Sequence, residues 1–204
     1  MFYTVGRFFC FLFFKIFFRL RIFGRENFPK KGPLIVAPNH VSFFDPILVG
    51  VGAPRKLYYL ARDTLFKFKP FAIILHLVNT FPLKREGSDV GAFKFALSTL
   101  KRKHAILIFP EGTRAKTSDL QEPKYGIGFL QARSNAAVIP CYVKGSDEAL
   151  PRHCIFPRPA RISVYFGKPL SFESAMSEDK KDRYVRIAEK VMKEIRILKE
   201  QNED

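Results

Sequence analysis

The sequence predicts an α/β protein: a single domain with a mainly parallel central sheet flanked by helices, preceded by an amphipathic N-terminal helical segment. Short apolar runs alternate with longer segments of helical periodicity along most of the 204 residues, and this alternation is typical of a parallel sheet. Residues 105–109 (AILIF) are continuously apolar, as expected of a strand covered on both faces. We therefore expect residues 1–27 to form a membrane-associated helical segment and residues 28–204 to form the domain.

The N-terminal segment, residues 1–27, is both aromatic and basic. Ten of the 23 phenylalanines lie within the first 28 residues. On a helix, the basic side chains fall within an arc of about 160°, and apolar side chains occupy much of the opposite side. Such a segment is expected to lie in a bilayer interface, with cationic heads at the lipid phosphates and aromatic rings below them. The basic residues are Arg7, Lys15, Arg19, Arg21 and Arg25.

Three other interpretations of residues 1–27 fit less well. A signal peptide would be followed by a small-residue cleavage site, and none follows the apolar run. A buried core helix would enclose five cations. A spanning helix needs about 20 mostly apolar residues, whereas the longest uncharged stretch between the cations is the seven residues 8–14. A single tilted span remains an alternative to interfacial docking.

Further along the chain, the hydrophobic pattern changes period from one segment to the next. Apolar runs of strand length occupy residues 34–37, 56–61, 80–84, 105–109, 137–143 and 162–166. Helical spacing occupies residues 65–77, 89–101, 127–133 and 177–199. Pro70 must lie in the first turn of its helix or kink it, because proline removes a backbone donor. The pattern therefore predicts strands that alternate with helices.

Charge and cysteine content restrict the class of protein. The formal net charge of +16 favours an anionic partner, such as nucleic acid, anionic lipid or a phosphorylated metabolite. The chain has only three cysteines, and they lie far apart in the sequence, at Cys10, Cys141 and Cys154. An odd number of widely separated cysteines argues against a disulfide framework and against a zinc site. We expect no metal, no bound cofactor and a reduced, cytosolic-side environment.

The first motif that could carry chemistry is NHVSFFDP, residues 39–46. Asp45 could fold back across a strand-to-helix turn and accept a hydrogen bond from one nitrogen of His40, which would leave the other nitrogen to accept a substrate proton. The same residues have a structural explanation, because Asp45 followed by Pro46 is a common helix start. Ser42 is an alternative N-cap residue for the same helix. The spacing alone does not choose between these explanations.

The second motif is FPEGTR, residues 109–114, at the end of an apolar strand. Ligands gather beyond the carboxyl ends of parallel strands. Gly112 lets the backbone approach a ligand, Thr113 offers a hydroxyl group, and Arg114 can bind a phosphate through two hydrogen bonds. An ordinary surface turn with a solvated Glu111 would explain the same residues.

Two further segments are less informative. FPLKR, residues 81–85, ends in adjacent cations, for which a solvated strand end is the usual explanation. KYGIGF, residues 124–129, lacks the residue order of the RNA-binding aromatic motif, and helix initiation explains it better.

The order of the motifs resembles one family. NHVSFFD, then FPLKR, then FPEGTR, then VIP at residues 138–140 is similar to the glycerolipid acyltransferases, specifically the lysophosphatidic acid acyltransferases. The resemblance extends from Gly24 onward, and the N-terminus looks like that family's membrane-docking helices. It implies an enzyme at the cytoplasmic face of the cell membrane that moves a fatty acyl group from acyl-CoA or acyl carrier protein to the sn-2 hydroxyl of lysophosphatidic acid, forming phosphatidic acid.

The resemblance also assigns expected roles to particular residues. His40 and Asp45 are the expected catalytic pair. Arg62 stands where the family commonly has lysine, and Lys84 stands where an acidic or small residue is frequent, so the acceptor preference stays open. The residues expected to bind the acceptor are Arg62, Arg85, Glu111, Gly112, Thr113 and Arg114.

The expected mechanism is direct transfer, because the sequence offers no convincing Ser or Cys nucleophile paired with a base. His40 would take the proton from the acceptor hydroxyl as its oxygen attacks the thioester, and Asp45 would orient the imidazole. The expected partners are a lysophospholipid, an acyl-CoA or acyl carrier protein thioester as co-substrate, and an anionic membrane surface.

Two competing functions remain at the level of the sequence. One is an acyltransferase of the same superfamily that acts on another lysolipid. The other is a nonenzymatic basic protein that binds a membrane surface or nucleic acid. The latter accounts for the charge but leaves the ordered motifs unexplained, so no nucleic-acid partner is expected.

Overall fold

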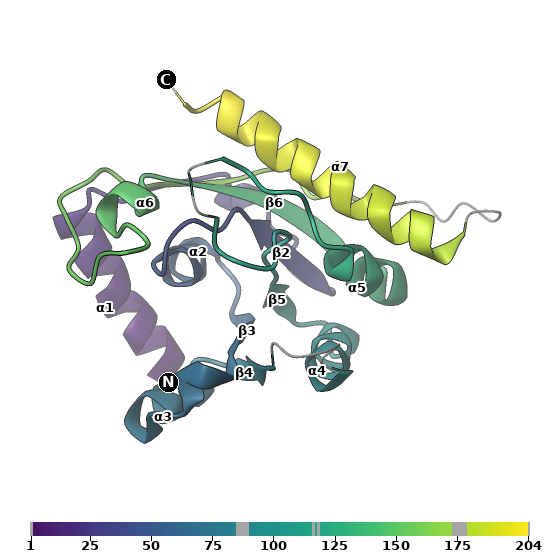
Figure 1. Ribbon diagram of the computed structural model, residues 1–204, viewed down its shortest axis with the longest axis horizontal. Coiled ribbons are helices and arrows are strands. Elements are labelled where there is room, and N and C mark those ends of the chain that lie inside the picture. The colour runs from purple at the N-terminus through teal and green to yellow at the C-terminus, as the bar shows by residue number, and fades with distance from the viewer. Residues whose placement is uncertain (1, 85–89, 116, 118, 173–178, 204) are drawn as a thin grey trace.

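The computed structural model describes residues 2–84, 90–115, 117, 119–172 and 179–203, and its centre is a seven-stranded sheet in the order β1-β7-β6-β2-β5-β3-β4 (Figure 1). Neighbouring strands run parallel except β6 and β7, which are antiparallel. This confirms the predicted mainly parallel sheet and places each predicted strand in it. The strands are β1 (Arg21–Phe23), β2 (Leu34–Pro38), β3 (Leu57–Arg62), β4 (Thr80–Leu83), β5 (Ala105–Leu107), β6 (Ala137–Lys144) and β7 (Ser163–Phe166).

Helices cover both faces of the sheet. Residues of β2 alternate between two cores: Leu34 and Val36 pack with α1 and α2, whereas Ile35 and Ala37 pack with α4, α5 and α7. This is why β2 is buried along its whole length and has the continuous apolar sequence of a covered strand. The helices are α1 (Phe2–Phe17), α2 (Asp45–Gly52), α3 (Lys69–Leu77), α4 (Val90–Lys101), α5 (Gly126–Ser134), α6 (Ser146–Ala149) and α7 (Lys180–Glu200), with 3₁₀ turns η1 (Arg25–Asn27) and η2 (Asp63–Phe66).

The segment at residues 1–27 is not the single helix that its composition predicted. Helix α1 ends at Phe17, and the chain turns at Arg19, whose φ of 48° is left-handed. Residues 21–23 then form the edge strand β1, which pairs in parallel with β7. Phe18 and Leu20 are buried in the core, and their burial favours the turn over a longer helix. The last three cations of the predicted basic arc therefore lie outside the helix.

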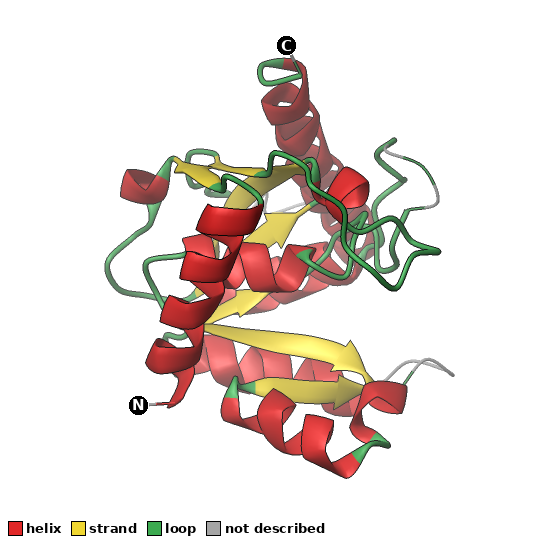
Figure 2. Cartoon of the chain, turned by 90° about the vertical axis from the view of Figure 1, so that its left-hand side faces the viewer, coloured by secondary structure: helices red, strands yellow, loops and turns green. Residues whose placement is uncertain are grey.

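Helix α1 packs against the protein with one side and exposes the other (Figure 2). Phe14 is buried, and its ring lies 5.0 Å from that of Phe44 between centroids. Four large apolar residues of α1, Phe9, Phe13, Ile16 and Phe17, are exposed. In the described part of the chain, no helix has the length and hydrophobicity needed to cross a bilayer.

The predicted helix at residues 65–77 is divided into two short elements. Residues 63–66 form the 3₁₀ turn η2, and α3 begins only at Lys69, with Pro70 in its first turn. This is one of the two positions that the sequence allowed for Pro70, because a proline in the first turn sacrifices no helical hydrogen bond.

Candidate active site

The turn between β2 and α2 brings His40 and Asp45 together. His40 Nδ1 lies 2.9 Å from Asp45 Oδ2. The Asp45 side chain is fully buried, whereas 16% of the His40 side chain is exposed. The pair that the sequence spacing allowed is therefore formed, with the carboxylate inside and the imidazole at the surface.

The Asp45 carboxylate is held by four donors. Its Oδ2 accepts from the backbone N–H groups of Val41, at 2.7 Å, and Ser42, at 2.8 Å, as well as from His40. Its Oδ1 accepts from the Ser146 hydroxyl at 2.6 Å. The two backbone donors precede the helix, and the N-cap of α2 is Phe44, which makes no side-chain cap bond. The helix-cap explanation of Asp45 is therefore wrong, although Pro46 does lie in the first turn.

These contacts fix the tautomer of His40. Since Asp45 Oδ2 already accepts two N–H bonds, it acts as an acceptor toward the imidazole, and Nδ1 carries the proton. Nε2 then carries a lone pair, and it makes no hydrogen bond to any residue within the described ranges. The ring also stacks on Phe109 at the end of the apolar run, with 3.7 Å between centroids and 15° between planes. The arrangement orients one free imidazole nitrogen as a proton acceptor.

The FPEGTR loop is bonded to both sides of the His40 backbone. Glu111 Oε1 accepts from the His40 N–H at 2.9 Å, and the His40 carbonyl accepts from the Ala115 N–H at 2.8 Å. Glu111 Oε2 accepts from the Gln121 N–H at 3.2 Å. Burial raises the pKa of the Glu111 carboxyl group, and the bonds from His40 and Gln121 oppose that shift. Glu111 is thus a buried anchor of the loop, and the alternative explanation by a solvated surface turn does not hold for this residue.

The other residues of this loop lie closer to solvent. Gly112 and Thr113 are exposed, and Gly112 has a left-handed φ of 72°, which favours glycine. The Arg114 guanidinium lies 3.5 Å from the ring centroid of Phe43. Arg114 of the FPEGTR motif therefore lies against the Phe43 ring of the NHVSFFDP motif.

Of the two other arginines expected to bind the acceptor, Arg62 and Arg85, the structure describes only Arg62. Arg62 is the exposed last residue of β3, and β5 separates β3 from β2. At about 4.8 Å per strand spacing, Arg62 is about 10 Å across the sheet from the end of β2. It shares the carboxyl edge with His40 but does not contact it. Arg85 lies outside the described residues, as does any contact it makes.

Sequence reasoning missed two residues that support the site. Asn39 ties the end of β2 to β6: its side-chain oxygen accepts from the Val143 N–H at 2.7 Å, and its amide donates to the Val143 carbonyl at 3.1 Å. Ser146, at the start of α6, donates to Asp45 across 101 positions of sequence. The Gly145-Ser146 pair before two acidic residues is a helix-start signal, but nothing in it indicates a partner at Asp45.

The Ser146 hydroxyl is expected to position the catalytic carboxylate. Ser146→Ala should lower kcat about tenfold with little change in KM, because a hydrogen bond to a charged group contributes about 1.5–3 kcal/mol while the other three donors keep Asp45 in place. Ser134→Ala is the matched control, since it removes a hydroxyl bonded to the Leu130 carbonyl at 2.6 Å. Steady-state kinetics check this; equal kcat values for the two variants contradict it.

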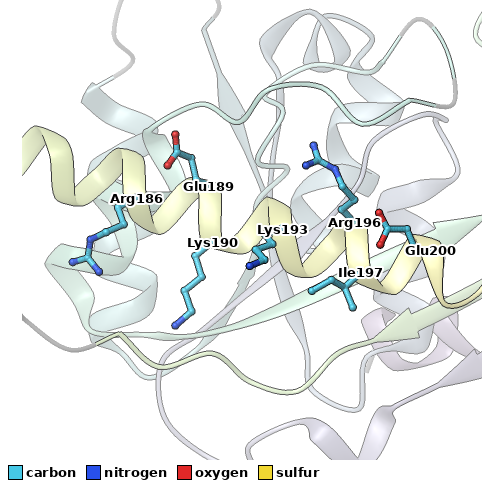
Figure 3. A pocket seen from close by; sticks show the side chains of 7 residues that line it. All are labelled: Arg186, Glu189, Lys190, Lys193, Arg196, Ile197 and Glu200. Atoms are coloured by element: carbon cyan, nitrogen blue, oxygen red, sulfur yellow. The ribbon is translucent and has the colours of Figure 1, made fainter.

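A depression of about 540 Å³ lies along the outer face of α7 and is separate from this site (Figure 3). Four basic side chains and two carboxylates line it, and all of them come from one helix. A surface built by a single helix brings no groups together from other elements, so we assign it no function. Its charged residues are Arg186, Glu189, Lys190, Lys193, Arg196 and Glu200.

The chain is similar in sequence to known acyltransferases. Residues 19–144 match the model of the Acyltransferase family. The 1-acyl-sn-glycerol-3-phosphate acyltransferase of Bacillus subtilis is 26% identical over 88% of this chain and 87% of its own length. The enzyme of the same name from Saccharomyces cerevisiae is 31% identical over 84% of this chain and 57% of its own length.

The fold also has a counterpart among solved structures. The 1-acyl-sn-glycerophosphate acyltransferase PlsC from Thermotoga maritima superimposes with a TM-score of 0.79 over 97% of this chain and 79% of its own, at 24% identity. The sheet and its helices share the fold of that enzyme, and the match over residues 19–144 shows that the chain belongs to the Acyltransferase family. Within that family, it groups with the lysophosphatidic acid acyltransferases, which are O-acyltransferases.

Proposed function

We propose that this chain transfers a fatty acyl group from an acyl-CoA or acyl carrier protein thioester to the sn-2 hydroxyl of lysophosphatidic acid, which yields phosphatidic acid. The observation that supports this most is the 2.9 Å hydrogen bond between His40 and Asp45, which leaves Nε2 as a base beside the FPEGTR loop. The relatives named for this acceptor support the choice of lipid.

In the proposed reaction, Nε2 of His40 takes the proton of the lipid hydroxyl while the oxygen attacks the thioester carbon. Asp45 stabilises the imidazolium that forms. The tetrahedral intermediate then collapses, the C–S bond breaks, and the departing thiolate takes the proton back from His40. The ester and the free thiol are the products.

Two nearby nucleophiles fit a covalent acyl-enzyme poorly. The Ser42 hydroxyl is buried and donates to the Leu150 carbonyl at 2.9 Å. Cys141 is buried, and burial followed by the nearby charge of Asp45 raises the pKa of its thiol well above the usual range. The thiolate is the reactive form of cysteine, so the raised pKa makes Cys141 a poor nucleophile. With the Ser42 hydroxyl also engaged, direct transfer is favoured over an acyl-enzyme.

The acceptor phosphate is proposed to bind Arg114, with Arg62 further along the same edge of the sheet. Arg85 stays a candidate from the FPLKR motif alone. Arg114→Ala should raise KM for lysophosphatidic acid by about 10- to 100-fold and leave kcat nearly unchanged, because a hydrogen bond to a charged group contributes about 1.5–3 kcal/mol. A neutral monoacylglycerol acceptor should show no such increase.

Arg133→Ala is the matched control for that prediction. Its guanidinium also lies over a phenylalanine ring, that of Phe129 at 5.9 Å, but on helix α5, away from the FPEGTR loop. Kinetics at varied acceptor concentration separate the two variants. An unchanged KM in Arg114→Ala contradicts the phosphate role.

The cellular site is proposed to be the cytoplasmic face of a membrane, to which α1 docks. The exposed phenylalanines of α1 and the basic Arg7 and Lys15 suit an interfacial helix. An anionic bilayer would supply both the docking surface and the lipid acceptor.

The decisive experiment combines the purified full-length protein with lysophosphatidic acid and either acyl-CoA or acyl-loaded acyl carrier protein, with phosphatidic acid detected by mass spectrometry. A panel of other lysolipids is run in parallel with the same donors. We expect phosphatidic acid to form fastest. Faster acylation of another lysolipid, or no product from any acceptor, contradicts the proposal.

A further inference from the structure

Helix α3 is exposed to an unusual degree for an apolar helix. None of its nine residues is buried. It lies at the β4 edge of the sheet, after the turn η2, and outside both hydrophobic cores. The exposed fractions of its large apolar residues are 41% for Phe71, 60% for Ile73, 47% for Ile74 and 46% for Leu77.

These side chains form one face. At 100° per residue, Phe71, Ile73, Ile74 and Leu77 fall within an arc of about 160°. Lys69 and His76 lie beyond that arc and are exposed as well. Since soluble monomers rarely expose contiguous apolar patches of this kind without a partner, the face is expected to be covered.

The charges around α3 favour a lipid surface as that partner. Lys67 and Lys69 are exposed at the start of the helix, where they could reach lipid phosphates while the apolar face is immersed. Three further cations, Arg7, Arg25 and Lys56, line a separate cleft of about 470 Å³ beside α1, the other proposed docking helix. An apolar face bordered by cations complements an anionic bilayer better than it complements a second copy of this basic chain.

The placement of α3 gives a second argument. Figures 1 and 2 show α1 and α3 on the same side of the molecule. One surface helix fixes a depth in the bilayer but leaves the protein free to rotate about the helix axis. A second apolar element away from that axis fixes which edge of the sheet meets the lipid.

We propose that α3 is a second lipid-docking element, which acts together with α1 to seat the protein on an anionic bilayer. The apolar face of Phe71, Ile73, Ile74 and Leu77 enters the interface, and Lys67 and Lys69 contact lipid phosphates. The proposal concerns binding alone and does not depend on which lysolipid the enzyme acylates.

The test is cosedimentation of the full-length protein with vesicles of phosphatidylcholine containing phosphatidylglycerol, compared with vesicles of phosphatidylcholine alone. Ile74→Asp places a carboxylate in the apolar face of α3. Val185→Asp is the matched control, because Val185 is 40% exposed on α7 and the substitution changes the net charge by the same amount. Both residues are exposed, so neither change removes core packing.

We expect Ile74→Asp to lower the partition coefficient on the anionic vesicles tenfold or more, and Val185→Asp to lower it less than twofold. Turnover of a detergent-dispersed substrate should be alike in both variants, which separates docking from chemistry. Equal binding by the two variants overturns the proposal. So does a change in oligomeric state by Ile74→Asp, measured by sedimentation velocity, without loss of vesicle binding, because a second copy would then cover α3.

Discussion

Replacing His40 should lower kcat by about 10²–10⁴-fold, the usual contribution of a positioned base. His40→Asn is the sharpest form of the test. The asparagine amide can donate to Asp45 from about the place of Nδ1, so the buried carboxylate keeps its donor, while no group replaces Nε2. The variant should fold and bind vesicles as the parent does, and its turnover is measured by phosphatidic acid formation.

His104→Asn is the control for this substitution. The His104 ring stacks on Tyr58 with 5.1 Å between centroids, as the His40 ring stacks on Phe109, but it has no carboxylate partner among the residues described. Its turnover should equal that of the parent chain. If His40→Asn keeps kcat within a few-fold of the parent value, His40 is not the base.

The central strands were predictable because their signals are local. Residues 34–37 and 105–109 are apolar without interruption, and the structure buries β2 and β5 between two helical layers. Strand β1 had no such signal. Its three residues lie in an aromatic, basic stretch, and its partner strand β7 is about 140 positions away in the sequence. Local periodicity does not encode pairing over that separation.

The candidate site was predictable in part for the same reason. His40 and Asp45 are five positions apart, so a single turn brings them together, and the order of the motifs joined them to residues 109–114. The burial of Glu111 was not predictable. An acidic residue in a Gly-containing turn is normally solvated, and only the bonds from the His40 and Gln121 N–H groups explain why this one is inside.

The site also shows how the sheet sets catalytic geometry. Asn39 locks the end of β2 to β6, the His40 ring rests on Phe109 beyond β5, and Ser146 after β6 reaches Asp45. Three neighbouring strands, in the order β6-β2-β5, therefore fix one imidazole. Because the support comes from rigid elements, the base is positioned before any substrate binds.

Substitutions of Asp45 separate its electrostatic role in the reaction from its structural role in the turn. In Asp45→Asn, the amide oxygen should occupy the Oδ2 place, where the Val41 and Ser42 N–H groups require an acceptor. The amide nitrogen then faces the Ser146 oxygen, which can accept. The neutral tautomer of His40 is therefore preserved, and only the negative charge that stabilises the imidazolium is lost. We expect kcat to fall about 10²-fold, with KM and the melting temperature nearly unchanged.

Asp45→Ala should behave differently, because it removes the acceptor as well as the charge. The Val41 and Ser42 N–H groups and the Ser146 hydroxyl would be left buried without a partner, at about 1–3 kcal/mol each. Its melting temperature should fall markedly, whereas that of Asp45→Asn should not. If Asp45→Asn retains the parent kcat, the negative charge of Asp45 does not serve the reaction. If Asp45→Ala keeps the melting temperature of Asp45→Asn, the carboxylate does not hold the turn.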